Sequence, residues 1–263
     1  MTKNNIKITL LILVIFFSTS IFFLFKLKFY MQNVHKDQFI KMVNQKIAES
    51  KDLNKQKFSR LYLHDAVTLG YTDAVKLLLD NKVLVDSKDQ TGRTPLHKAA
   101  YLGRISISKM LLDYGANINS KTNTGQTPLF FAVGAEVNRK ETTTILLQRG
   151  ADMSVKDVSG NTPLHWAVFQ DSLECVILLI EFGSDINKTD NEGNTPLHAA
   201  SFYGRSMIAE YLIKNNAVIN NRNLNGHTPL YISQNSYSVS KYASRKQQKK
   251  TSEILINYGG KEY

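Results

Sequence analysis

Short apolar segments alternate with polar turns along most of this 263-residue chain, and the alternation is periodic. The clearest marker of the period is the tripeptide Thr-Pro-Leu, which contains all five prolines of the sequence. Its threonines are separated by 33, 35, 33 and 33 residues and are Thr94, Thr127, Thr162, Thr195 and Thr228. A period of this length predicts a stack of similar structural units in place of one globular core.

Each period contains two predicted helices. The threonine that opens residues 94–103 can accept a hydrogen bond from free helix amides, and proline tolerates the first helical position. Two small alanines in this segment allow close packing, and its final glycine ends the helix. A second apolar helix ends at residues 110–112, before Gly115, and a turn such as residues 89–92 leads to the next threonine. The unit is therefore helix, turn, helix and extended turn.

The sequence of residues 94–103 is Thr-Pro-Leu-His-Lys-Ala-Ala-Tyr-Leu-Gly, and residues 162–168 and 195–201 repeat its first part closely. With these motifs the chain resembles ankyrin repeats, whose signature is Thr-Pro-Leu-His-x-Ala-Ala-x-x-Gly. Residues 63–70 align one period upstream without Thr-Pro, as an end repeat can. The resemblance covers residues 58–263 and implies an all-α ankyrin-repeat solenoid of helix-turn-helix units joined by extended turns. The six expected repeats span about 59–88, 92–121, 125–156, 160–189, 193–222 and 226–263.

Two repeats depart from the signature, because Phe130 and Tyr231 replace its histidine. The last repeat also has ten extra residues between its Thr-Pro and its glycine. We expect this insertion, within residues 234–250, to loop out before residues 253–256 close the stack. Its basic residues are Lys241, Arg245, Lys246, Lys249 and Lys250.

Residues 8–25 form an uncharged, largely apolar run that follows a short flank, residues 1–7. As a helix this run is roughly 27 Å long, close to the hydrocarbon thickness of about 30 Å. We expect an uncleaved transmembrane anchor and a single-pass membrane protein. A cleaved signal peptide, with residues 18–20 at the cleavage site, would instead give a secreted protein. A buried helix of a soluble protein is the third interpretation, and the side of the membrane that the repeats face stays open.

A basic stalk, residues 26–57, is expected between the anchor and the repeats. Phe39, Met42, Val43 and Ile47 recur there at helical spacing and predict a partly amphipathic helix. The stalk is either a solvated spacer or a segment attracted to anionic lipid headgroups.

The net charge of +11 is confined to the two ends of the chain. Residues 1–60 carry 11 Lys/Arg and 3 Asp/Glu, whereas residues 61–227 carry 16 and 17. A groove that follows phosphates needs positive charge along the array, so we expect no nucleic-acid partner. The single cysteine, Cys175, excludes an intramolecular disulfide and a cysteine-based zinc site, and we expect it to be a small buried residue. No cofactor and no metal are expected.

Four of the six histidines occupy one equivalent position in successive repeats: His64, His97, His165 and His198. The resemblance implies a structural role, in which this histidine bonds the threonine hydroxyl and the backbone of neighbouring units. The other two, His35 and His227, have no carboxylate, serine or cysteine partner at a recognisable spacing. We therefore expect no enzymatic activity.

In ankyrin repeats the turn tips and the inner helices form a concave surface that binds other proteins. Alignment carries this surface over to ten positions of the chain: Lys98, Tyr101, Phe131, Trp166, Phe169, Phe202, Tyr203, Arg93, Asn161 and Asn194. Aromatic residues and arginine are enriched in binding hot spots. The alternative is that the rings pack between adjacent repeats.

We therefore expect a monomeric array that binds an unidentified protein through its concave face and is held in a membrane by residues 8–25. One alternative is a secreted ankyrin-repeat effector. Another is attachment to a membrane surface through the basic ends of the chain, with the repeats as a spacer.

Overall fold

The computed structural model describes residues 34–48, 56–235 and 244–262. The chain divides into two compact parts, Met1–Leu53 and Asn54–Tyr263. In the first part, residues 34–48 form one helix, which contains the four apolar residues of the predicted stalk. No helix in the described ranges is both long and apolar enough to cross a membrane. The expected anchor, residues 8–25, lies outside these ranges.

Every described element of the second part is a helix, and the helices form six pairs. These pairs are called units one to six in chain order. The pairs are α2 (Gln56–Leu69) and α3 (Thr72–Asp80), α4 (Pro95–Tyr101) and α5 (Ile105–Asp113), α6 (Pro128–Val133) and α7 (Arg139–Gln148), α8 (Pro163–Phe169) and α9 (Leu173–Glu181), α10 (Pro196–Phe202) and α11 (Ser206–Lys214), and α12 (Pro229–Asn235) and α13 (Arg245–Asn257). This confirms the all-α class predicted for the repeats.

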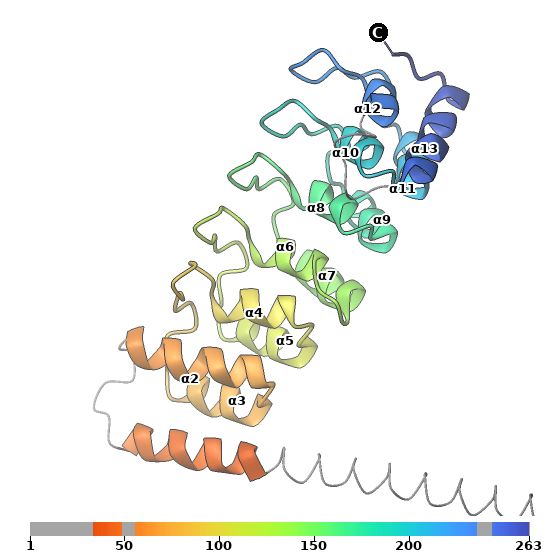
Figure 1. Ribbon diagram of the computed structural model, residues 1–263. Coiled ribbons are helices and arrows are strands. Elements are labelled where there is room, and N and C mark those ends of the chain that lie inside the picture. Colours follow the sequence, from red (N-terminus) through yellow and green to blue (C-terminus); the bar gives the residue numbers. More distant parts are fainter. Residues whose placement is uncertain (1–33, 49–55, 236–243, 263) are drawn as a thin grey trace, which may run out of the picture. The chain divides into compact units, whose positions relative to one another are not determined.

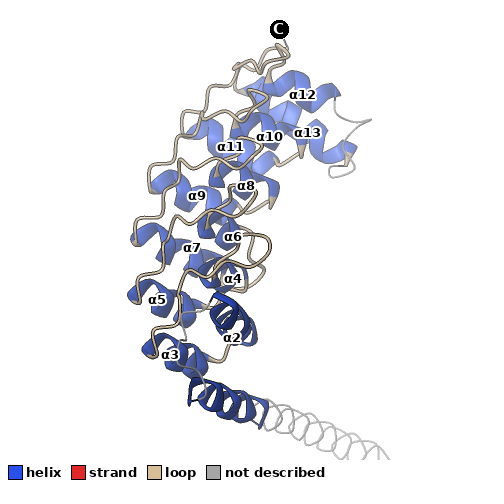
Figure 2. Ribbon diagram, turned by 90° about the vertical axis from the view of Figure 1, so that its left-hand side faces the viewer, coloured by secondary structure: helices blue, strands red, loops and turns tan. Residues whose placement is uncertain are grey.

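The pairs stack side by side, so that the first helices of the units form one row and the second helices another (Figure 1). The extended turns project from one side of the stack and lie in front of the helices when that side faces the viewer (Figure 2). Each unit therefore buries its apolar residues against the units before and after it, as expected for a repeat array.

The core follows the Thr-Pro-Leu motif. The threonine has an extended backbone before α4, α6, α8 and α10, and each helix begins at the proline that follows. The leucine then points into the stack, and its exposed fraction is at most 3 % in all five copies: Leu96, Leu129, Leu164, Leu197 and Leu230. Burying one leucine stabilises a fold by about 1.5–3 kcal/mol, so this row contributes strongly to cohesion between units.

The histidines of the motif connect successive units, as the resemblance implied. The Nε2 atom of His97 donates to the carbonyl oxygen of Gln126 in the next turn (3.1 Å), and His165 and His198 make the equivalent bond at 3.1 Å. Because a carbonyl only accepts, the proton is on Nε2 and Nδ1 is free to accept. The Nδ1 atom of His97 accepts from the amide (3.0 Å) and the hydroxyl (2.8 Å) of Thr94.

The two repeats without this histidine differ in whether the threonine hydroxyl has a partner. In unit three, where Phe130 replaces it, the buried hydroxyl of Thr127 has no partner among the described residues. In unit six, where Tyr231 replaces it, the hydroxyl of Thr228 donates to the carbonyl oxygen of Lys261 (2.6 Å). The end of the chain thus takes the place of a histidine in the last unit.

Two units contain extra residues, and these lie at different places. In unit three, the spacing of 35 residues from Thr127 to Thr162 adds two residues, which lengthen the turn between α6 and α7. The insertion in unit six was expected to loop out over residues 234–250, and this prediction is partly wrong. Residues 236–243 lie outside the described ranges, but α13 begins at Arg245 because Ser244 caps it and pairs with Gln247. The side chain of Gln248 is buried and donates to the carbonyl oxygen of Phe202 (3.2 Å), which anchors the added helical turn.

Candidate functional site

The inner face of the array consists of the first helices and the turn tips that precede them. In the tip before α6 the hydroxyl of Thr122 accepts from the amide of Gln126 (3.2 Å). The other four tips are each closed by a carboxylate or amide whose Oδ1 atom accepts from the backbone amides two and four residues later. These closing residues are Asp89, Asp157, Asp190 and Asn223, with N···O distances of 2.8–3.1 Å. Adjacent tips are also joined by backbone bonds, such as the bond from the amide of Asn191 to the carbonyl of Ser159 (3.1 Å). The tips therefore form a rigid edge beside the helices.

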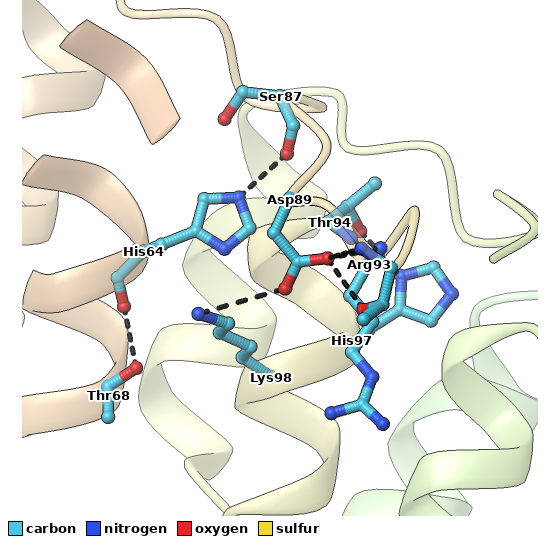
Figure 3. Close-up of polar contacts among 9 residues, drawn as sticks. His64, Thr68, Ser87, Asp89, Arg93, Thr94, His97 and Lys98 are labelled. Atoms are coloured by element: carbon cyan, nitrogen blue, oxygen red, sulfur yellow. Dashed lines mark hydrogen bonds and ion pairs between the residues drawn. The ribbon is translucent and has the colours of Figure 1, made fainter. Parts of the chain in front are cut away.

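Figure 3 shows the first of these tips. The carboxylate of Asp89 accepts from the amide of Arg93 (3.0 Å) and lies 3.9 Å from the ammonium of Lys98, which comes from α4. Behind it, the Nε2 atom of His64 donates to the carbonyl oxygen of Ser87 (2.7 Å). The tip is thus tied both to its own unit and to the unit before it.

The larger hollow of the inner face, called the groove, has a volume of about 860 Å³ and lies over units four to six. Three consecutive turn tips form one wall and residues from α8, α10 and α12 form the floor. Its lining residues are Val158, Ser159, Asn161, Phe169, Asp190, Asn191, Glu192, Asn194, His198, Ala199, Phe202, Tyr203, Asn223, His227, Tyr231, Ile232 and Asn235. The combination of aromatic floor and polar wall is typical of sites that bind a ligand in a defined orientation.

A smaller hollow, called the aromatic pocket, has a volume of about 270 Å³ and lies over units two to four. Its lining residues are Arg93, Tyr101, Gln126, Phe130, Phe131, Gly134, Trp166 and Gln170. The guanidinium carbon of Arg93 lies 4.8 Å from the centre of the Phe131 ring, within the range of a cation–π contact.

Aromatic rings connect the two hollows. Ring centres are 6.2 Å apart for Trp166 and Phe169, 5.3 Å for Phe169 and Tyr203, and 5.0 Å for Phe202 and Tyr203. These four rings are half-buried. Each ring packs on a neighbouring ring and still lines a hollow.

The structure brings nine of the ten predicted partner-binding residues to these hollows. The groove collects Asn161, Phe169, Asn194, Phe202 and Tyr203, and the aromatic pocket collects Arg93, Tyr101, Phe131 and Trp166. Lys98 lines neither hollow, because it is half-buried and turned towards Asp89. The indole nitrogen of Trp166 donates to the Oδ2 atom of Asp157 (2.9 Å), so its polar end is already used.

The other lining residues were absent from the predicted set, among them Tyr231, Ile232 and Asp190. Tyr231 occupies the position of the missing histidine, and Ile232 follows it in the inner-face position. Asp190 closes a turn tip, and its pattern in the sequence indicated only turn chemistry. The departure at Tyr231 was the available signal, since a large ring replaced a residue that is otherwise fully buried.

The histidines of the inner face are suited to structure. Burial lowers the pKa of His97 and of His198 to about 4, and it also lowers the pKa of His64 and His165. Both ring nitrogens of His97, His165 and His198 are engaged in the bonds described above, so none is positioned to transfer a proton to a substrate.

The remaining chemistry of the described residues is similarly limited. They contain no group of three or more histidine, cysteine or acidic side chains that could hold a metal ion. Cys175 is buried, and its burial raises the pKa of the thiol, which disfavours the reactive thiolate. What the site offers is a shaped surface with aromatic, amide and carboxylate groups.

The fold and the site define a helical repeat array with a binding face. A sequence model of the family described as ankyrin repeats (3 copies) matches residues 31–122, 63–157, 114–190, 133–223 and 164–261. The chain therefore belongs to the ankyrin-repeat family, which typically serves as a non-enzymatic protein-interaction module. No match to the chain was found among curated proteins.

Proposed function

We propose that this chain binds a partner protein through the inner face of its repeats and performs no catalysis itself. The groove carries the proposal, because it joins an aromatic floor to a rigid polar wall over three successive units. Rings that lose their remaining exposure in a complex are frequent hot spots, each contributing about 2 kcal/mol or more.

The test is co-purification of a partner with the full chain in non-ionic detergent. The variant Trp166→Ala/Phe202→Ala removes one ring from the aromatic pocket and one from the groove. We expect at least ten-fold less partner, with an unchanged helical circular dichroism signal. The matched control is Phe182→Ala, since this ring is 40 % exposed at the end of α9 and lines neither hollow. Equal recovery of the partner with both variants would contradict the proposal.

We also propose that residues 8–25 anchor the chain in a membrane. The length and the absence of charge in this run support the proposal. Sequencing the amino terminus of the mature protein should show that residues 8–25 are retained. The protein should also stay in the membrane fraction after extraction with alkaline carbonate. A mature terminus near residue 21 would instead support the secreted alternative. Protease access on intact cells reports the side that the repeats face.

A second candidate function is attachment to an anionic membrane surface. The observation that favours it is the first part of α13, where four exposed basic side chains follow one helical stripe: Arg245, Lys246, Lys249 and Lys250. With the full chain in nanodiscs, anionic lipid should protect this stripe from trypsin and 0.5 M salt should remove the protection. Equal cleavage in neutral and anionic nanodiscs would exclude this candidate.

A further inference from the structure

In units two, four and five an aspartate closes the turn tip, and its Oδ2 atom meets a different partner in each of the three. The residue nine positions later on the inner helix decides which one. In unit two this residue is Lys98, whose ammonium lies 3.9 Å from Asp89 Oδ2. In unit four it is Trp166, whose indole nitrogen donates to Asp157 Oδ2 at 2.9 Å. In both units the inner helix therefore supplies a long side chain with a polar hydrogen to the carboxylate.

Unit five lacks this side chain. The equivalent residue is Ala199, whose methyl group can neither reach Asp190 nor donate to it. The Oδ2 atom of Asp190 accepts from the side-chain amide of Asn194 (3.2 Å), which belongs to the same turn tip and also donates to the Oε2 atom of Glu192 (3.2 Å). Asp157 receives the equivalent amide contact from Asn161 (3.5 Å) in addition to the indole. The space that a longer side chain would fill is part of the groove, which both Asp190 and Ala199 line.

The charges around this space have one sign. Asp190 and Glu192 are the two carboxylates of the groove, and no lysine or arginine is among its described lining residues. Burial lowers the pKa of His198 to about 4, so this imidazole is neutral at pH 7. The ring of His227 stacks on Tyr231 with centres 4.0 Å apart. The described lining of the groove thus combines two carboxylates with aromatic rings and contains no cationic side chain.

One lysine lies near the same turn without lining the groove. The ammonium of Lys156 donates to the carbonyl oxygen of Thr189 (2.6 Å). Lys88 makes the equivalent bond to the carbonyl oxygen of Lys121 (2.9 Å), which also belongs to the following turn. Lys156 is therefore held by a backbone carbonyl and is not among the residues that line the groove.

We propose that the groove binds an extended segment of the partner protein through a lysine or arginine side chain, whose cation lies beside the carboxylates of Asp190 and Glu192. This side chain would occupy the position that Lys98 takes in unit two, and its alkyl stem would lie on Phe202 and Tyr203. The proposal rests on the proposed protein-binding function and specifies the chemistry of the bound segment. Charge-assisted bonds to a carboxylate and contacts of a cation with aromatic faces both favour such a side chain.

Three variants test separately the charge of Asp190 and the space beside Ala199. Asp190→Asn removes the charge but preserves the turn, because Asn223 closes the next tip through the same two amide bonds. Ala199→Lys supplies the cation from within the chain, as unit two does. Asp89→Asn is the matched control, since it removes an equal charge from a carboxylate that already has Lys98 beside it.

The probe is a phage library of random twelve-residue peptides, selected on the full chain in non-ionic detergent. Peptides that bind in the groove are recognised by their loss on Phe202→Ala and their retention on Phe182→Ala. We expect these peptides to contain one recurrent lysine or arginine. Their affinity should fall about ten-fold on Asp190→Asn and on Ala199→Lys, and by less than two-fold on Asp89→Asn.

A double-mutant cycle gives the decisive measurement. Acetylating the recurrent lysine, or exchanging the arginine for citrulline, should cost about ten-fold on the parent chain and almost nothing on Asp190→Asn. Groove-binding peptides without a recurrent basic residue, or with additive losses in the cycle, would overturn the inference and leave the proposed function standing. A library that yields no peptide sensitive to Phe202→Ala would count against both.

Discussion

At the scale of single residues, the array is held together by a polar pair repeated along the stack. His97, His165 and His198 each accept from a threonine of their own unit and donate to the following turn. These bonds require neutral imidazoles that are fully buried, with exposed fractions of at most 1 %. The connection between units is therefore sensitive to protonation.

The first prediction concerns pH. The pKa of His97 and His198 is about 4 in the folded chain and 6.5 as the ordinary value, so the unfolded chain binds protons first as the pH falls. Stability is complete above pH 6.5, is lost between pH 6.5 and 4, and changes no further through these groups below pH 4. Each of the two histidines should cost about 2 kcal/mol by pH 5 and on the order of 3 kcal/mol by pH 4.

Urea unfolding followed by circular dichroism at pH 7.5 and pH 5 measures this loss. The carboxylates of Asp89 and Asp152 have lowered pKa values, below 3.8, and titrate under more acidic conditions. Burial raises the pKa of Asp86, so its protonation favours the folded chain as the pH falls and has the opposite sign. A loss of stability between pH 7.5 and 5 is therefore assigned to the histidines. A free energy of unfolding that stays constant across this interval would contradict the neutral, buried histidines of the array.

At the scale of elements, the turns between helices set how closely neighbouring units approach. The two added residues of unit three lie between α6 and α7, and this longer turn packs on Gly103 of unit two. The side-chain amide of Asn138 donates to the carbonyl oxygen of Gly103 (3.0 Å). Gly103 has a positive φ of 60°, and a methyl group there would lie 2.1 Å from the carbonyl oxygen of Val137.

The second prediction is that Gly103→Ala destabilises the array more than Gly115→Ala does. Both glycines have positive φ, so both changes incur strain of about 1 kcal/mol. Only Gly103 has a neighbour in the way, whereas a methyl group at Gly115 meets no atom within 4 Å. The difference in unfolding free energy should exceed about 1 kcal/mol. Equal losses for the two variants would show that the longer turn does not press on unit two.

At the scale of the whole array, stability should depend on nearest neighbours, with the end units opening first. Unit one lacks Thr-Pro, and the buried Nδ1 atom of His64 has no hydrogen-bond partner among the described residues. Unit six replaces the histidine bond with one to Lys261, close to the end of the chain. The units that begin at Thr94 and Thr195 have complete pairs.

The third prediction is therefore that amide hydrogens of units one and six exchange faster than those of units two and five. Hydrogen exchange followed by mass spectrometry on the full chain in non-ionic detergent resolves the helices. The matched comparison is between α4 and α12, two helices of equal length that differ in this pair. Uniform protection from residue 61 to residue 256 would refute the prediction.

Much of the fold could be predicted from the sequence because its signals are local. A proline at a helix start, a glycine at a helix end and a leucine two residues after Thr94 act over a few residues. The ankyrin motif then placed these signals in register. The start of α13 was missed because the cap formed by Ser244 and Gln247 lies next to an insertion without a counterpart in the other units.

By itself, the sequence determined the period, the helices and the structural histidines. It also indicated ten inner-face residues, of which nine line the two hollows. Only the tertiary structure decided that Lys98 turns away to Asp89 and that a groove opens over units four to six. The physical reason is that a hollow depends on side chains about 33 residues apart meeting across neighbouring units. Ala199 is unremarkable in its own helix, and it becomes important only because the fold places it beside the carboxylate of Asp190.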